Sequence, residues 1–115
     1  MASENPMNTV IAVYRVRPDR REEFLALLSK HYPVLNRLGL VTDDEPIVYS
    51  GAEHDGGPIV LEIFTWKNAE APGIAHQTPD VAKVWEAMGT MTEERDGRPK
   101  FFFPHVEKLD LAFAE

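Results

Sequence analysis

The sequence predicts one α+β domain over residues 1–115, with elements in the order strand, helix, strand, strand, helix, strand. A chain of 115 residues has the usual length of a single domain. Two runs of β-branched and aromatic residues, 9–16 and 59–66, have the composition of strands. Two further segments, after Asp19 and after Thr78, repeat apolar residues at helical spacing. These observations predict a mixed fold with a hydrophobic core.

The composition restricts the partners and the chemistry that we expect. The formal net charge of −7 would repel a phosphate backbone, so nucleic acid is not an expected partner. The absence of cysteine excludes disulfides, thiolate nucleophiles and cysteine-ligated metal sites. The histidines are scattered outside any metal-ligand motif, so we expect no metal. Without an apolar run of about 18 residues or an N-terminal signal core, we expect a cytoplasmic protein and no membrane partner.

The first strand, 9–16, is apolar on both faces, and a helix is expected to follow it. Asp19 can cap that helix, and Gly39 is expected to end it. Pro33 lies inside the helical pattern, so it should kink the helix or end its first segment near Tyr32. The apolar stripe of this helix consists of Phe24, Leu27, Leu28, His31, Leu35 and Leu38.

Residues 47–50 predict a second, short strand, and an Asp-Gly turn leads into the strongest strand, 59–66. One face of this third strand carries Val60, Glu62, Phe64 and Trp66. Residues 69–75 predict one or two helical turns. The second long helix is expected to begin at Thr78-Pro79, with the stripe Val81, Val84, Trp85, Met88 and Met91. The last strand is expected over 101–109, where Pro104 indicates an edge or a bulge.

This order of elements is the split β-α-β arrangement of ferredoxin-like domains. Two helices can cover only one face of a four-stranded sheet. The first and third strands are nevertheless apolar on both faces, so the second face needs a cover. A second copy related by two-fold symmetry is the simplest cover. We therefore expect a homodimer joined sheet to sheet, a two-fold dimeric α+β barrel.

The end of the third strand, Phe64-Thr65-Trp66-Lys67, and the following 75–81 segment, Ala-His-Gln-Thr-Pro-Asp-Val, resemble the antibiotic biosynthesis monooxygenase-like family of dimeric α+β barrel proteins. The resemblance extends over most of the chain. Members of this family include cofactor-free oxygenases of polycyclic aromatic phenols, quinol oxygenases and haem-degrading enzymes.

Two departures from the family pattern limit what the resemblance implies. Some cofactor-free members carry an Asn four residues before the strand-end Trp, and Glu62 stands at that position here. A carboxylate can accept a proton but cannot donate an amide hydrogen bond to a substrate carbonyl. In the haem-degrading members an iron-ligating His and a Trp share one helix, whereas His76 precedes the helix that carries Trp85. The haem role is therefore not carried over.

The resemblance and the residues together predict a cofactor-independent monooxygenase, without metal or flavin, that binds an aromatic or quinol-type molecule between sheet and helices. His76 and Glu62 are the candidate catalytic residues, and Glu62 should either pair with an Arg or Lys or line the pocket. The candidate substrate-binding residues are Trp66, His31, Tyr32, Trp85, Tyr14 and Tyr49. Each of these side chains could instead have a structural role. A non-catalytic small-ligand-binding dimer and a haem-binding or haem-degrading protein are the alternatives.

Overall fold

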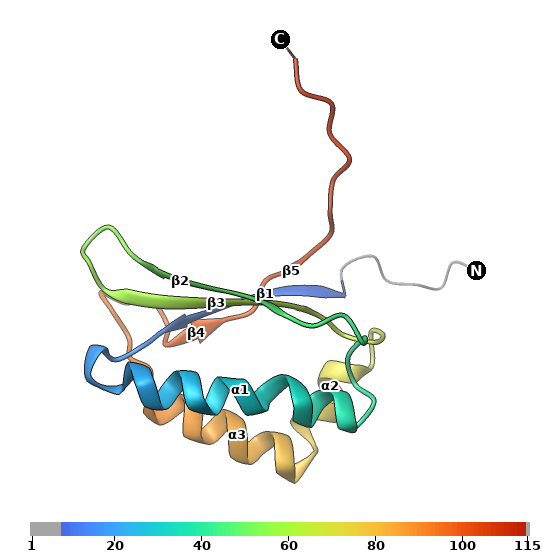
Figure 1. Cartoon of the computed structure of the whole chain (residues 1–115), viewed down its shortest axis with the longest axis horizontal. Coiled ribbons are helices and arrows are strands. Elements are labelled where there is room, and N and C mark those ends of the chain that lie inside the picture. The colour runs from blue at the N-terminus through green and yellow to red at the C-terminus, as the bar shows by residue number, and fades with distance from the viewer. Residues whose placement is uncertain (1–7, 115) are drawn as a thin grey trace.

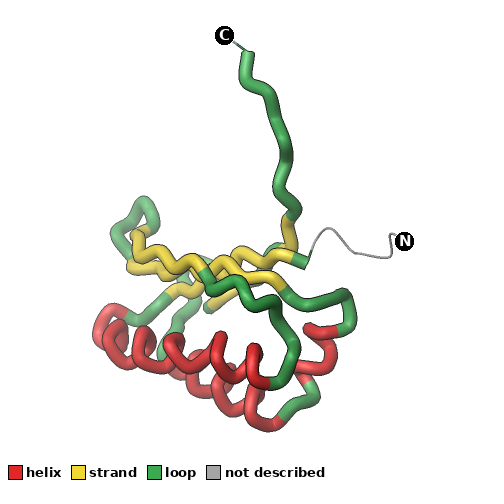
Figure 2. Tube along the Cα trace, turned by 45° about the vertical axis from the view of Figure 1, so that its right-hand side comes forward, coloured by secondary structure: helices red, strands yellow, loops and turns green. Residues whose placement is uncertain are grey.

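The computed structural model describes residues 8–114, which form a layer of strands above a layer of helices (Figure 1). Figure 2 shows the same two layers from a second direction. The buried hydrophobic core lies between them. The elements in chain order are β1 (Thr9–Arg15), a 3-10 turn η1 (Pro18–Arg20), α1 (Arg21–Arg37), β2 (Ile47–Ala52), β3 (Pro58–Thr65), α2 (Ala71–His76), α3 (Pro79–Thr90), β4 (Phe101–Phe102) and β5 (His105–Val106).

The strands form one antiparallel sheet in the order β2-β3-β1-β4, and β5 also pairs with β1. This is the strand order of a ferredoxin-like domain, so the predicted fold class is confirmed. The register pairs Val10 with Phe64 and Tyr14 with Val60, which places all four side chains on the face toward the helices. Within this sheet β1 and β3 are the central strands, and they carry Tyr14 and Glu62 respectively.

The helix α1 continues through Pro33 to Arg37, so it does not end near Tyr32. Pro33 removes one backbone donor, whose partner would have been the carbonyl of Ser29. Both residues are exposed, so water can bond to the carbonyl that the proline leaves without a partner. The buried face of α1 carries Phe24, Leu28, His31 and Leu35, as the helical spacing predicts.

The predicted last strand, 101–109, is wrong in extent, because within this segment only Phe101–Phe102 (β4) and His105–Val106 (β5) pair with β1. Phe103 and Pro104 separate the two short strands. Pro104 has no N–H to donate, but its carbonyl accepts a hydrogen bond from the backbone N–H of Ile11 at 3.1 Å. Beyond Val106 the chain leaves the sheet on the side opposite the helices (Figure 1).

The face of the sheet that points away from the helices is the outer face, and it carries exposed apolar side chains. Ile47 and Tyr49 of β2 are 55% and 58% exposed, and Phe102 of β4 is 42% exposed. The helices α1 and α3 pack against each other below the inner face. The outer face of the single chain therefore has the apolar character on which the expectation of a dimer rests.

No helix within residues 8–114 combines the length and the apolar character needed to cross a membrane.

Candidate functional site

A cavity of about 220 Å³ lies between the inner face of the sheet and the helices. Its walls are mostly aromatic and aliphatic, with imidazole groups among them. The lining residues are Val10, Tyr14, His31, Phe64, Trp66, Pro72, His76, Trp85, Met88, Phe101, Phe103 and His105. Apolar walls with a few polar groups are typical of small-molecule sites.

Strand register and helical spacing bring these residues together. Side chains alternate along a strand, so Val10 and Tyr14 of β1 share the inner face with Phe64 of β3. Trp85 and Met88 are three residues apart on α3, and both line the cavity. The cavity therefore combines side chains from opposite ends of the chain.

Glu62 and His31 form a buried pair beside the cavity. Nδ1 of His31 lies 3.0 Å from both carboxylate oxygens of Glu62. Glu62 is only 1% exposed and His31 is 3% exposed. The Glu62 carboxylate thus pairs with a histidine. The sequence analysis expected it either to pair with an arginine or lysine or to line the pocket.

Trp85 determines the tautomer of His31. Its indole Nε1 lies 2.9 Å from Nε2 of His31. An indole N–H can only donate, so Nε2 must be the accepting nitrogen. The proton of the neutral ring therefore sits on Nδ1, which donates it to Glu62. This assignment follows from the hydrogen-bond network.

Tyr14 completes the network from the sheet side. Its hydroxyl donates to Oε1 of Glu62 at 2.8 Å. Burial, then the negative charge of Glu62 and then this hydrogen bond raise the pKa of Tyr14 well above its ordinary value of 10.0. The phenol consequently stays protonated and acts as a donor to the carboxylate. Glu62 is held by two donors, one from β1 and one from α1.

His76 and Trp66 lie at the cavity in different surroundings. His76 ends α2 and is exposed, and its ring packs edge-on against Trp85 with ring centroids 4.9 Å apart. Trp66 follows β3 and is buried, with its ring 5.2 Å from that of Phe64. His76 is therefore a group at the mouth of the cavity, and Trp66 is part of its wall.

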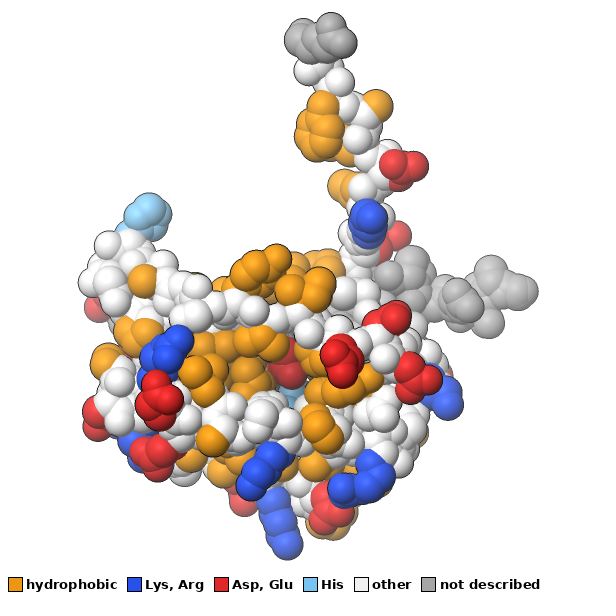
Figure 3. All heavy atoms as spheres, in the orientation of Figure 1, with side chains coloured by type: hydrophobic (Ala, Val, Ile, Leu, Met, Phe, Trp, Pro, Cys, Tyr) orange, Lys and Arg blue, Asp and Glu red, His pale blue; other side chains and the backbone are white. Residues whose placement is uncertain are grey.

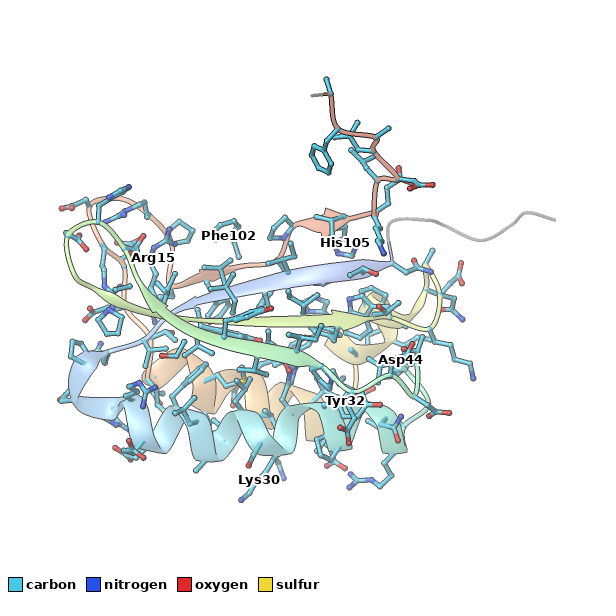
Figure 4. All side chains as sticks on the ribbon, turned by 45° about the horizontal axis from the view of Figure 1, so that its top comes forward. Arg15, Lys30, Tyr32, Asp44, Phe102 and His105 are labelled. Atoms are coloured by element: carbon cyan, nitrogen blue, oxygen red, sulfur yellow. The ribbon has the colours of Figure 1, made fainter. Side chains whose placement is uncertain are left out.

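Two predicted substrate-binding residues do not line this cavity. Tyr49 is on the outer face of the sheet. Tyr32 lies beside the loop that carries Asp44 (Figure 4), and its hydroxyl donates to the carbonyl of Thr42 at 2.9 Å. Burial and the charges of the nearby loop acids, first among them Asp43, raise the pKa of Tyr32 above its ordinary value.

Tyr32 and Glu62 line a second cavity, of about 370 Å³, between α1 and β2. Figure 3 looks onto the hollow on this side, where hydrophobic side chains surround an acidic and a histidine side chain. Glu62 thus lies in the wall behind His31, between the two cavities, and does not line the first cavity.

The sequence analysis did not name several residues of the wall as site residues. Phe101, Phe103 and Met88 belong to this group, as does His105. The pairing of Tyr14 with Phe101 and of Val10 with His105 turns both partners toward the cavity. The positions of Phe101 and His105 in the wall follow from the register of the short final strands. Within residues 8–114 no cluster of three or more His, Cys, Asp or Glu side chains is arranged to hold a metal ion.

Comparison with solved structures places the fold among known proteins. An antibiotic biosynthesis monooxygenase superposes with a TM-score of 0.64 at 15% identity, over 88% of this chain and 97% of that one. A Mycobacterium tuberculosis protein superposes with a TM-score of 0.57 at 21% identity, over 91% of this chain and 97% of that one. A dimeric ferredoxin-like protein of unknown function from Jannaschia gives 0.50 at 15% identity, over 87% and 97%.

The chain therefore has the ferredoxin-like α+β fold of antibiotic biosynthesis monooxygenase-like proteins, and the resemblance predicted from the sequence is confirmed at the level of the fold. Sequence identities this low carry no activity or substrate over to this chain. No protein-family model matches the sequence, and a search of curated proteins finds no match.

Proposed function

We propose that the protein is a cofactor-independent monooxygenase that binds an aromatic or quinol-type phenol in the first cavity. The observation that carries this proposal is the combination of aromatic walls with imidazole groups in one cavity. Its volume of about 220 Å³ is below the roughly 300–1,000 Å³ of sites for drug-sized ligands. The substrate is accordingly a small molecule of one or a few fused rings.

The chemistry needs a base and an electron-rich substrate. A base removes the phenolic proton, and the resulting anion is electron-rich enough to react with dioxygen directly. For a naphthol, oxidation to the quinone converts one ring C–H and the C–OH into carbonyl groups. One oxygen atom of dioxygen enters the product, and the other leaves as water with the two hydrogens. The substrate supplies all four electrons, so the reaction requires no external reductant.

Three imidazoles line the cavity, those of His31, His76 and His105, and we assign the proton transfer to one of the first two. His76 lies at the exposed mouth, and His31 lies in the wall with Glu62 behind it. Trp66 and Trp85 supply the apolar surfaces against which an aromatic ring can stack. A general base at such a position contributes about 10²–10⁴-fold to a rate.

Oxygen consumption tests this proposal. The protein is incubated with a panel of anthrones and dihydroxynaphthalenes, and uptake is followed with an oxygen electrode beside a protein-free sample. We expect a protein-dependent rate that falls in His76→Ala and stays unchanged in His54→Ala. His54 is exposed in the turn between β2 and β3, so it is a matched control. A panel with no protein-dependent rate would remove the proposal.

The same cavity also suits a non-catalytic dimer that binds a small aromatic ligand. The complete pairing of His31, Glu62 and Tyr14 favours this alternative, because a network with every partner in place also serves as a rigid wall. Tight binding of a phenol without any oxygen uptake would distinguish the binding protein from the enzyme.

We also propose that the functional unit is a homodimer joined through the outer faces of two sheets. The exposed Ile47, Tyr49 and Phe102 support it, because a lone apolar sheet face favours association. One structural neighbour is described as a dimeric ferredoxin-like protein, which supports the same assembly.

A further inference from the structure

We infer that His31 is the base that takes the phenolic proton, that Glu62 positions it, and that the indole of Trp85 caps it until a ligand displaces the indole. This inference rests on the proposed function, since it identifies the base of that same cavity. The class of ligand is a small phenol whose O–H replaces the indole N–H at Nε2 of His31.

The hydrogen bonds of His31 give it the arrangement of a general base. Its Nδ1–H is held by the carboxylate of Glu62, so the lone pair of Nε2 is directed to the opposite side of the ring. His31 is also one of the residues that line the cavity. A carboxylate that fixes the tautomer and stabilises the imidazolium is the usual partner of a catalytic histidine.

Trp85 occupies the position that the substrate hydroxyl needs. Its N–H donates to Nε2 at 2.9 Å, as a phenol O–H would. Trp85 is half-buried in the cavity wall, between the ring of His31 and that of His76. A phenol that inserts here exchanges one donor for another, so Nε2 keeps a hydrogen bond throughout.

The transfer step is balanced within the cavity. The phenolic O–H bond breaks, an N–H bond forms at Nε2, and the electron pair stays on the oxygen as a phenolate. The new imidazolium lies 3.0 Å from the carboxylate oxygens of Glu62, where the two opposite charges compensate each other. His76 lacks this support, because within residues 8–114 no carboxylate forms a hydrogen bond with its ring, which packs against Trp85.

The test uses 2-naphthol as a probe, because its absorption spectrum distinguishes the neutral from the ionised form without any turnover. Naphthol is titrated with the full chain at pH 7 under nitrogen. The titration gives the dissociation constant of naphthol and the fraction of the bound probe that is naphtholate. Oxygen uptake with the same variants is recorded separately. The variants are Glu62→Gln, Trp85→Phe and His76→Ala, with His54→Ala as the control.

In the wild type we expect bound naphtholate. Glu62→Gln keeps the shape of the side chain but removes the charge that stabilises the imidazolium, so the ratio of bound naphtholate to bound naphthol should fall about 10-fold or more, which corresponds to one pKa unit or more. Trp85→Phe keeps an aromatic ring but removes the cap, so affinity should rise about 2- to 10-fold, as expected from the loss of one competing hydrogen bond. His76→Ala removes part of the cavity wall and should weaken binding, which also lowers the oxygenation rate, but the ratio of bound naphtholate to bound naphthol should stay unchanged because His31 and Glu62 remain in place.

The possible failures are distinguishable. Naphtholate that is lost in His76→Ala and kept in Glu62→Gln would overturn the assignment of His31. Weaker binding in Trp85→Phe would overturn the capping role of the indole. Bound naphtholate without oxygen uptake for any phenol would overturn the oxygenase proposal alone. Absence of naphthol binding would overturn both proposals.

Discussion

The indole N–H of Trp85 donates a hydrogen bond to Nε2 of His31 at 2.9 Å. The two residues are 54 positions apart in the chain, and the contact joins α3 to α1. His31 in turn forms a hydrogen bond with Glu62 of β3. The three side chains therefore form a hydrogen-bond network that links the helix layer to the sheet through the core. Buried networks of this kind contribute to stability only when each member has its partner.

Tyr14→Phe is predicted to destabilise the protein by about 1.5–3 kcal/mol. The substitution removes the hydroxyl that donates to the buried Glu62 carboxylate, and hydrogen bonds to charged groups have this magnitude. Urea unfolding followed by circular dichroism measures the change. Lys30→Ala is the control, since that side chain is exposed on α1, away from the outer face of the sheet, and it should change stability by less than about 0.5 kcal/mol. Equal effects of the two substitutions would contradict the prediction.

Alkaline titration is predicted to show one late tyrosine. The pKa of Tyr14 is raised well above 10.0 in the folded protein by burial and by Glu62. A raised folded-state pKa means that the contribution of this group to stability is complete below about pH 10 and is lost as pH rises further.

The ultraviolet absorbance of tyrosinate measures the ionisation of the tyrosines as pH rises. Tyr14 should ionise only well above pH 10, together with unfolding, and this late phase should be missing in Tyr14→Phe. If the phase that is missing in Tyr14→Phe precedes any unfolding seen by circular dichroism, the assignment is wrong.

Low pH is predicted to lower the stability of the folded protein through the protonation of Glu53. This carboxylate accepts hydrogen bonds from Arg15 at 3.1 Å, Arg95 at 3.1 Å and Arg98 at 2.7 Å. Burial alone would raise the pKa of Glu53, but the bonds and charges of these arginines outweigh it and hold the pKa below its ordinary value of 4.5.

Because the folded-state pKa is depressed, this contribution to stability is present above about pH 4.5 and is lost as pH falls through the folded-state value. Glu53→Gln should therefore be less stable than the wild type at pH 7. Its further loss of stability between about pH 5 and pH 2, where a carboxyl with a depressed pKa takes up its proton, should be smaller than that of the wild type. Urea unfolding across this range provides the measurement. Glu22→Gln, at an exposed carboxylate of α1, is the control and should follow the wild type.

The outer face is predicted to form the dimer. The wild type should have twice the 13.0 kDa mass of the chain in size-exclusion chromatography with light scattering. Tyr49→Asp places an unpaired charge in that interface and should raise the dissociation constant by about 100-fold or more. Lys30→Asp, on the opposite, helical side (Figure 4), should leave the mass unchanged. A wild-type protein that is monomeric at all concentrations would exclude this assembly.

Much of the candidate site follows from periodicity. The spacing of Phe24, Leu28 and Leu35 predicts that His31 faces the core, because residues three and four apart share one side of a helix. The alternation along 59–66 likewise predicts that Glu62 shares a face with Trp66. These relations are local, so the sequence alone determined them together with the order of elements and the fold class.

The tertiary structure decided which groups meet. Periodicity separates the two faces of a strand, but it cannot tell which face lies inward when both are apolar, and this is why Tyr49 was expected in the pocket. The pairing of Glu62 with His31 and of His31 with Trp85 depends on how α1 and α3 pack on the sheet. Such contacts between distant positions arise from packing and leave no periodic signal in the chain.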